Sequence, residues 1–279
     1  MIGQAERLYE LNHLYKKEDK AVYKNNIIAF TSGKGGTGKT IISLNTAFGS
    51  AIDGKKVLYI DLDLNFANAA IMLNIYSEST IIDFFKGSNN LSSLIYKYHN
   101  NLHFIFGDSG RLDFPKVDKG SIFKLFNEIQ QLSDKYDLII IDTGAGAAEE
   151  TLEILLNSAI TVIISSTEPT SIMDCYVIHK LLKFNNYKGV KSVIINRCEN
   201  EKDGENAFRN LTTAVNHFIK EPAKLIGLVN DDVEISRSIK EQKIFISRNP
   251  ASTTAMQIKK ISKNIYDNLQ LVNINQIKK

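Results

Sequence analysis

A glycine-rich stretch near the start of the chain combines backbone freedom with lysines and hydroxyl groups. It reads Gly33-Lys34-Gly35-Gly36-Thr37-Gly38-Lys39-Thr40 and fits the pattern G-x-x-x-x-G-K-[ST]. In this pattern backbone N–H groups surround phosphates, the last lysine neutralises them, and the adjacent hydroxyl binds Mg²⁺. A glycine-rich turn without a ligand is the alternative. The apolar run before the stretch and the helical pattern after it favour a phosphate-binding loop.

Three aspartates follow apolar runs and supply the acids that such a loop needs. Asp61 and Asp63 come directly after the run Val57–Ile60, and their two-residue spacing places both carboxylates on one face of an extended chain. Asp142 follows the run Leu138–Ile141, where phosphoryl-transfer proteins hold Mg²⁺ with an acid. For Asp61 and Asp63, capping of the next helix is the alternative.

The loop and the aspartates are expected to be positioned by a sheet whose strands are buried on both faces. Apolar, β-branched runs predict strands at Ile27–Thr31, Val57–Ile60, Leu102–Phe106, Leu138–Ile141, Ile160–Ile164, Val190–Ile195 and Lys224–Val229. Helical patterns are predicted at Thr40–Ala51, Gly120–Lys135, Ser171–Phe184, Gly204–Lys220 and Ser252–Leu271. This alternation predicts one doubly wound α/β domain with a mostly parallel sheet. Ligands bind at the carboxyl edge of such a sheet, so we expect the loop and the aspartates to meet there.

Composition excludes several classes of protein. The 279 residues are 43% hydrophobic and 23% charged, with a formal net charge of +3, so neither global disorder nor a nucleic-acid partner is indicated. Cys175 and Cys198 are too far apart for a metal or redox pair, which favours the cytoplasm. No apolar run of about 18 residues predicts a membrane span. We expect a polar N-terminal helix and linker at 1–24, a nucleotide domain at 25–250 and a C-terminal helix at 251–279.

The extra lysine in the loop resembles a feature of one family. The form K-G-G-x-G-K-T at residues 34–40 is similar to the deviant phosphate loop of the MinD/ParA ATPases, P-loop NTPases of the SIMIBI type. The resemblance implies ATP and Mg²⁺ as cofactors, and an ATP-bound homodimer in which Lys34 contacts the nucleotide of the partner subunit. A lysine that faces solvent is the alternative.

The same resemblance assigns chemical roles. It implies that Asp63 orients the attacking water and that Asp61 supports the Mg²⁺ shell. The implied catalytic residues are Lys34, Lys39 and Asp63. The implied Mg²⁺ residues are Thr40, Asp61 and Asp142. Relatives usually carry glycine at the position of Asn65, a departure that spares both acids of the D-x-D motif.

The resemblance also indicates where the base is bound. The strand Val190–Ile195 runs into Asn196-Arg197, and relatives use the matching asparagine to contact the adenine edge, so both residues are expected in the nucleotide site. Satisfaction of local backbone groups is the alternative for Asn196. Relatives also carry a G-x-hydrophobic-P-x-D segment. Here Asn230 takes the place of the proline.

The first residues resemble a narrower group, the FlhG family of flagellar MinD-like ATPases. The segment Gly3–Tyr9 is similar to its D-Q-A-x-x-L-R motif: Gln4, Ala5 and Leu8 match, whereas Gly3 and Tyr9 depart. The resemblance implies that this helix docks on an FlhF-type GTPase and that Gln4 stimulates GTP hydrolysis. A frayed tail is the alternative.

The C-terminal helix has two interpretations. Ile261, Ile265, Leu269 and Val272 form an apolar stripe, with lysines nearby. Relatives bind acidic lipid through such a helix. This chain lacks Trp and has no Phe after Phe245, so we favour a helix packed on the core over lipid insertion.

Together these features predict an ATPase of the FlhG kind that controls flagellar number or placement. The resemblance implies further partners: proteins of the flagellar switch complex, a flagellar transcription factor and the inner face of the cell membrane. One rival is a division-site or cargo-positioning ATPase, which would not need Gln4. Another is a nucleotide-dependent scaffold with little turnover.

Overall fold

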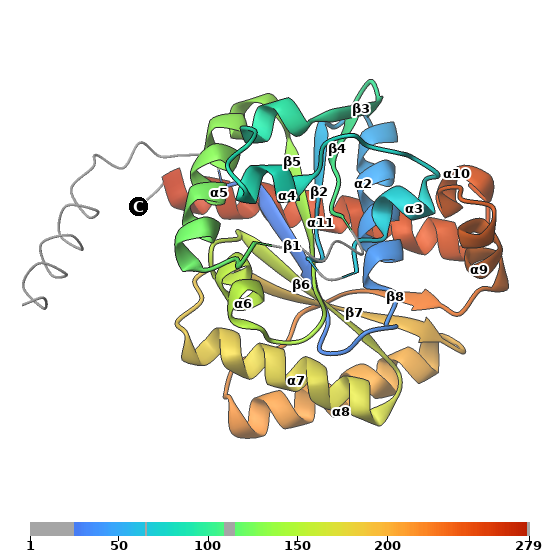
Figure 1. Ribbon diagram of the computed structural model, residues 1–279. Helices are drawn as coiled ribbons and strands as arrows, with labels where there is room; N and C mark the ends of the chain where they lie inside the picture. Colours follow the sequence, from blue (N-terminus) through green and yellow to red (C-terminus); the bar gives the residue numbers. More distant parts are fainter. Residues whose placement is uncertain (1–24, 65, 109–114, 278–279) are drawn as a thin grey trace, which may run out of the picture.

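A computed structural model describes residues 25–64, 66–108 and 115–277, so Gln4, the whole 1–24 segment and Asn65 lie outside the described residues. Eight strands in this part of the chain form a sheet of order β3-β4-β2-β5-β1-β6-β7-β8 (Figure 1). They are β1 Ile27–Thr31, β2 Val57–Leu62, β3 Tyr96–His99, β4 Leu102–Ile105, β5 Leu138–Thr143, β6 Ile160–Ser166, β7 Val190–Cys198 and β8 Leu225–Asn230. All neighbouring pairs are parallel except β3–β4, which confirms the doubly wound fold.

Alternate residues of the strands enter two different cores. In β1, Ile27 and Ala29 pack on one face of the sheet and Ile28 and Phe30 on the other. Successive side chains of a strand point to opposite faces, and every residue of β1 is buried because helices cover both. This burial explains why the central strands are apolar at consecutive positions.

Two sets of helices cover the sheet (Figure 1). The core that contains Ile27 also receives apolar side chains from α4 Ile81–Phe85, η1 Leu91–Leu94, α5 Lys119–Leu132, α6 Glu149–Leu156, α7 Pro169–Phe184 and α8 Glu201–Phe218. The other core receives them from α2 Lys39–Ile52, α3 Ala69–Met72, α10 Phe245–Arg248 and α11 Thr253–Ile277. Two short elements complete the described chain, η2 Ser133–Lys135 and α9 Val233–Lys240.

The C-terminal helix packs on the core. Ile261, Ile265 and Leu269 of α11 are buried at 1%, 1% and 0% exposure, in the same core as α2. This stripe is therefore not free to insert into lipid in this conformation. None of the helices in the described part of the chain is long and apolar enough to cross a membrane.

Several element boundaries differ from the sequence prediction. The helix predicted from Gly204 begins at Glu201, where the Asn200 side chain accepts a hydrogen bond from the backbone N–H of Asp203. Gly204 lies inside this helix, where close packing leaves no room for a side chain: a Cβ there would meet Cys198 Sγ at 2.7 Å. Strand β3 is missing from the prediction, since all four of its residues are exposed and carry no apolar run.

A buried histidine on α7 predicts that the free energy of unfolding falls at acidic pH. His179 is fully buried, neither ring nitrogen has a hydrogen-bond partner among the described residues, and Nε2 lies 3.9 Å from Glu221 Oε2. Burial lowers the pKa of His179 to about 4, and the charge of Lys191 acts in the same direction. Protonation of His179 therefore favours the unfolded chain.

We expect this histidine to destabilise the protein by about 2 kcal/mol at pH 5 relative to pH 8. Between pH 4 and pH 6.5 the imidazole binds more protons in the unfolded chain than in the folded chain, so the free energy of unfolding rises with pH across that window. Below that window the loss of stability due to His179 is complete. Thermal unfolding of His179→Leu should show a flatter pH dependence than wild type, whereas the control His217→Leu, at an exposed position of α8, should not. Equal slopes for His179→Leu and wild type would contradict the assignment.

Candidate nucleotide site

The phosphate-loop sequence connects β1 to α2 and is shaped by close packing. Gly38 immediately precedes α2 with a left-handed φ of 89°, and a side chain at this position would collide with the Asn196 amide. Gly33 packs so closely against Asp174 of α7 that a Cβ would overlap it. The Thr37 hydroxyl is buried without a hydrogen-bond partner in the described structure. Such an orphaned polar group at the loop fits a phosphate oxygen as its missing partner.

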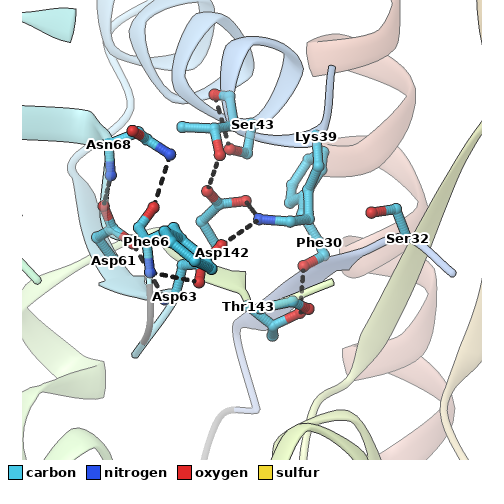
Figure 2. Close-up of polar contacts among 12 residues, drawn as sticks. Phe30, Ser32, Lys39, Ser43, Asp61, Asp63, Phe66, Asn68, Asp142 and Thr143 are labelled. Carbon is cyan, nitrogen blue, oxygen red and sulfur yellow. Dashed lines mark hydrogen bonds and ion pairs between the residues drawn. The ribbon is translucent and has the colours of Figure 1, made fainter. Parts of the chain in front are cut away.

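A buried cluster lies directly behind the loop (Figure 2). Asp142 at the end of β5 is fully buried; its Oδ1 accepts from Lys39 Nζ at 3.0 Å and its Oδ2 from Thr40 Oγ1 at 2.6 Å. Lys39 itself is only 6% exposed. The sheet thus brings together the lysine, the hydroxyl and the acid predicted from segments about 100 residues apart.

The two acids after β2 do different things. Asp61 is buried and accepts backbone hydrogen bonds from Asp63, Asn68 and Ala69, each at 3.1 Å, so it holds the loop and caps α3 (Figure 2). Burial, and next the charge of Asp142, raise the pKa of Asp61 to about 7. Asp63 Oδ1 accepts from the Phe66 N–H at 3.1 Å, while its Oδ2 lies 3.9 Å from Lys39 Nζ.

Lys34 has partners within its own chain. Its Nζ lies 2.6 Å from Glu168 Oε2 and 3.0 Å from Thr170 Oγ1, at the start of α7. This lysine lowers the pKa of Glu168 by hydrogen bonding and by its charge. Both groups are partly exposed, and an exposed ion pair of this kind contributes little to stability. The contact can therefore be exchanged for another at small cost.

A cavity of about 650 Å³ extends from the phosphate loop to the ends of β7 and β8. Asn196 and Arg197 both line it, and Asn196 Nδ2 donates to the Thr37 carbonyl at 2.8 Å and so supports the loop itself. The cavity wall also includes residues that were not among the predicted site residues: Phe66, Met72, Glu150, Ile235 and Ile239. Asp231 and Asp232 line it as well, and they belong to the segment Gly227–Asp232 whose pattern resembles that of relatives.

The residues present fit a nucleotide with Mg²⁺. No group of three or more His, Cys, Asp or Glu side chains able to hold a metal occurs within the described ranges. Mg²⁺ needs none, since it keeps several waters and binds through one or two carboxylates and the substrate phosphates. Thr40 and Asp142 offer the two adjacent oxygens at the carboxyl edge of the sheet. Fold and site together define a P-loop ATPase.

Comparisons with known proteins agree with this class. A family model described as an AAA domain matches residues 25–194, more than half of the chain. The chain is 30% identical to the virulence plasmid ParA family protein pGP5-D of Chlamydia psittaci, over 87% of this chain and 95% of that protein. The chain belongs to the MinD/ParA family of ATPases within this domain class.

Two further relatives and one solved structure are similar to this chain over most of its length. The antiactivator FleN of Pseudomonas aeruginosa is 24% identical over 89% of both chains. The flagellum site-determining protein YlxH of Helicobacter pylori is 28% identical over 94% of this chain and 90% of its own. The septum site-determining protein MinD of Pyrococcus horikoshii, solved with Mg-ADP, superposes with a TM-score of 0.74 at 24% identity, over 86% of this chain and 95% of that one. This last likeness supports the fold.

Proposed function

We propose that this chain is an ATP-driven switch of the FlhG type, which controls the number or placement of flagella. The observation that supports the ATPase part most strongly is the Lys39–Asp142–Thr40 cluster behind the phosphate loop. The flagellar part is supported by the likeness to YlxH over nearly the full length of both chains. In this proposal residues 25–250 are the ATPase domain and 251–279 the C-terminal helix.

ATP binding uses the loop residues Gly33–Thr40. Backbone N–H groups hold the phosphates, and Lys39 moves its charge from Asp142 toward the β- and γ-phosphates. Thr40 and Asp142 hold Mg²⁺, which neutralises developing charge on the phosphates when bound. Asp63 orients the attacking water. Asp61 supports the Mg²⁺ shell indirectly, because both oxygens of Asp61 already accept backbone hydrogen bonds from the loop.

Dimerisation depends on Lys34 and links nucleotide state to assembly. In the proposed ATP-bound homodimer Lys34 leaves Glu168 and Thr170 and contacts the phosphates of the partner subunit's nucleotide. Asn196 and Arg197 contact the base in this proposal, which is supported by their place in the lining of the same cavity. Hydrolysis removes the γ-phosphate and returns the monomer. The protein acts in the cytoplasm, with peripheral contact to the inner face of the cell membrane.

The partner in this proposal is an FlhF-type GTPase that Gln4 activates. We expect a peptide of residues 1–20 to raise the GTP hydrolysis rate of the purified, GTP-loaded partner, and Gln4→Ala to remove that increase. The physical reason is that a side-chain amide can orient the attacking water in a GTPase site. Full-length Gln4→Ala should keep its own ATPase rate.

Two outcomes would redirect the assignment. If the peptide does not stimulate a partner that is demonstrably dimeric and GTP-loaded, a division-site or cargo-positioning ATPase is the better description. If the full-length protein shows no ATP turnover even with partner and lipid, it acts as a scaffold. Equal stimulation by wild-type and Gln4→Ala peptides would exclude the role of Gln4.

A further inference from the structure

The loop after β8 is held by a side chain from the C-terminal helix. Asn230, the last residue of β8, lines the nucleotide cavity. Gln257 of α11 makes two hydrogen bonds to it: Gln257 Oε1 accepts from the Asn230 backbone N–H at 3.0 Å, and Gln257 Nε2 donates to Asn230 Oδ1 at 3.1 Å. Both residues are half-buried. The paired amides fix the main chain and the side chain of Asn230 together.

The helix that carries Gln257 is itself fixed on the strand it serves. Asn264 Nδ2 donates to the Ile226 carbonyl at 3.0 Å, about two helical turns beyond Gln257. Between these two points Ile261 lies directly over Gly227, where any side chain would collide with it. Three consecutive contacts therefore hold α11 along β8, and the register of Gln257 with Asn230 is determined by close packing.

Asn230 lies at the end of the cavity away from the phosphate loop, and its position affects the elements that form this end. The next residue, Asp231, donates its N–H to the Cys198 carbonyl at 2.9 Å, beside Asn196 and Arg197 on β7. Asp232 then caps α9 by accepting from the Glu234 N–H at 2.9 Å. Ile235 and Ile239 of α9 form the apolar wall of the cavity. A shift of Asn230 moves this wall relative to the phosphate loop.

The support is needed because Asn230 carries a backbone N–H and a side-chain amide at the edge of the cavity. Gln257 Oε1 accepts from that N–H at 3.0 Å, and Gln257 Nε2 donates to the Asn230 side chain at 3.1 Å. Without Gln257 these half-buried polar groups would lose their partners, and the conformation of Asn230 would be less restricted.

We infer that Gln257 is a positioning residue for nucleotide affinity: it acts through Asn230 to place the wall that receives the nucleoside end of ATP. The inference rests on the proposed ATP site and deepens it. Gln257 does not line the cavity and makes no contact with the Lys39–Asp142–Thr40 cluster, so its influence falls on binding and leaves the chemical step unchanged.

The test compares steady-state ATP hydrolysis by full-length variants. Gln257→Met keeps the side-chain length and removes both hydrogen bonds; KM for ATP is expected to rise about 10-fold, equivalent to about 1.4 kcal/mol, with kcat within about twofold. Gln257→Glu should keep KM near wild type, because its oxygens accept from the Asn230 N–H and, after rotation of the Asn230 amide, from Nδ2. Asn264→Leu is the matched control, since it removes a hydrogen bond between the same helix and strand.

The conservative variant and the control separate positioning from general loosening of the helix. Gln257→Glu retains hydrogen bonds to Asn230 and should retain the wild-type KM, and Asn264→Leu should leave KM unchanged although it removes a contact between the same helix and strand. If Gln257→Met fails to fold, Gln257→Ser, too short to reach Asn230, takes its place. Melting temperatures are measured for every variant.

Each outcome supports or overturns the positioning role of Gln257. Unchanged KM in Gln257→Met overturns the inference while leaving the ATPase proposal intact. An equal rise in Asn264→Leu, or a rise in Gln257→Glu as large as that in Gln257→Met, shows a merely structural helix contact and also overturns it. If wild type neither binds nor hydrolyses ATP, the proposed function fails first and the inference with it.

Discussion

Lys39→Ala is expected to lower ATP turnover at least ~10³-fold and to weaken nucleotide binding. The lysine supplies the positive charge that the β- and γ-phosphates meet, and preorganised charges of this kind account for effects on the order of 10²–10³ or more. Lys39 Nζ also neutralises the fully buried Asp142. Its removal leaves Asp142 with Thr40 as hydrogen-bond partner and with Asp61 nearby, so the metal-free protein should lose about 3–5 kcal/mol of stability.

Lys191→Ala provides the matched control for this variant. Its side chain is 8% exposed, against 7% for Lys39, and it pairs with Glu221 away from the phosphate loop. Thermal unfolding should show a loss of stability in both variants, whereas a coupled phosphate-release assay should show a loss of turnover in Lys39→Ala alone. Turnover within tenfold of wild type in a folded Lys39→Ala would exclude this lysine from the site.

Asp63→Ala is expected to lower ATP turnover by about 10²–10⁴-fold while ATP binding persists. A positioned carboxylate that orients or accepts a proton from water contributes on this scale. Unlike Asp61, Asp63 keeps an oxygen free of backbone hydrogen bonds: Oδ1 accepts from the Phe66 N–H, while Oδ2 faces Lys39 at 3.9 Å. Its removal should therefore leave the phosphate loop and the buried cluster in place.

Asp118→Ala separates this chemical role from simple capping. Asp118 accepts from the backbone N–H three residues ahead at 2.8 Å, as Asp63 does, but it caps α5 away from the cavity. Turnover should be normal in Asp118→Ala and nearly absent in Asp63→Ala, with similar ATP affinity in both. Normal single-turnover hydrolysis by Asp63→Ala would show that its carboxylate serves the loop alone.

The central sheet could be predicted because its strands are buried on both faces. β1 and β5 begin with four consecutive apolar residues and β6 with the mostly apolar stretch ITVII, and such runs are typical of parallel strands covered by helices on both sides. Short or polar elements gave no such signal: α3 has four residues, and β3 carries only exposed ones. Their positions follow from tertiary contacts, such as the backbone hydrogen bonds from α3 to Asp61.

The candidate site shows the same division. The proximity of Lys39, Thr40 and Asp142 could be predicted because the phosphate-loop pattern restricts both residue type and spacing, and the structure brings the three side chains together. The ion pair between Lys34 and Glu168 joins positions 134 residues apart, and the Gln257–Asn230 amide pair joins the C-terminal helix to a strand end. Neither contact has a local sequence pattern, since each depends on which helix the fold lays beside which strand.

The measurement that tests the central claim most directly is the mass of Asp63→Ala in solution with ATP and Mg²⁺, by sedimentation velocity. The account predicts a dimer with ATP, a monomer with ADP, and a monomer in both when Lys34→Ala is added, because in the proposed dimer Lys34 provides the cation that contacts the γ-phosphate across the interface. A monomer with saturating ATP, or a dimer that does not depend on Lys34, would contradict it.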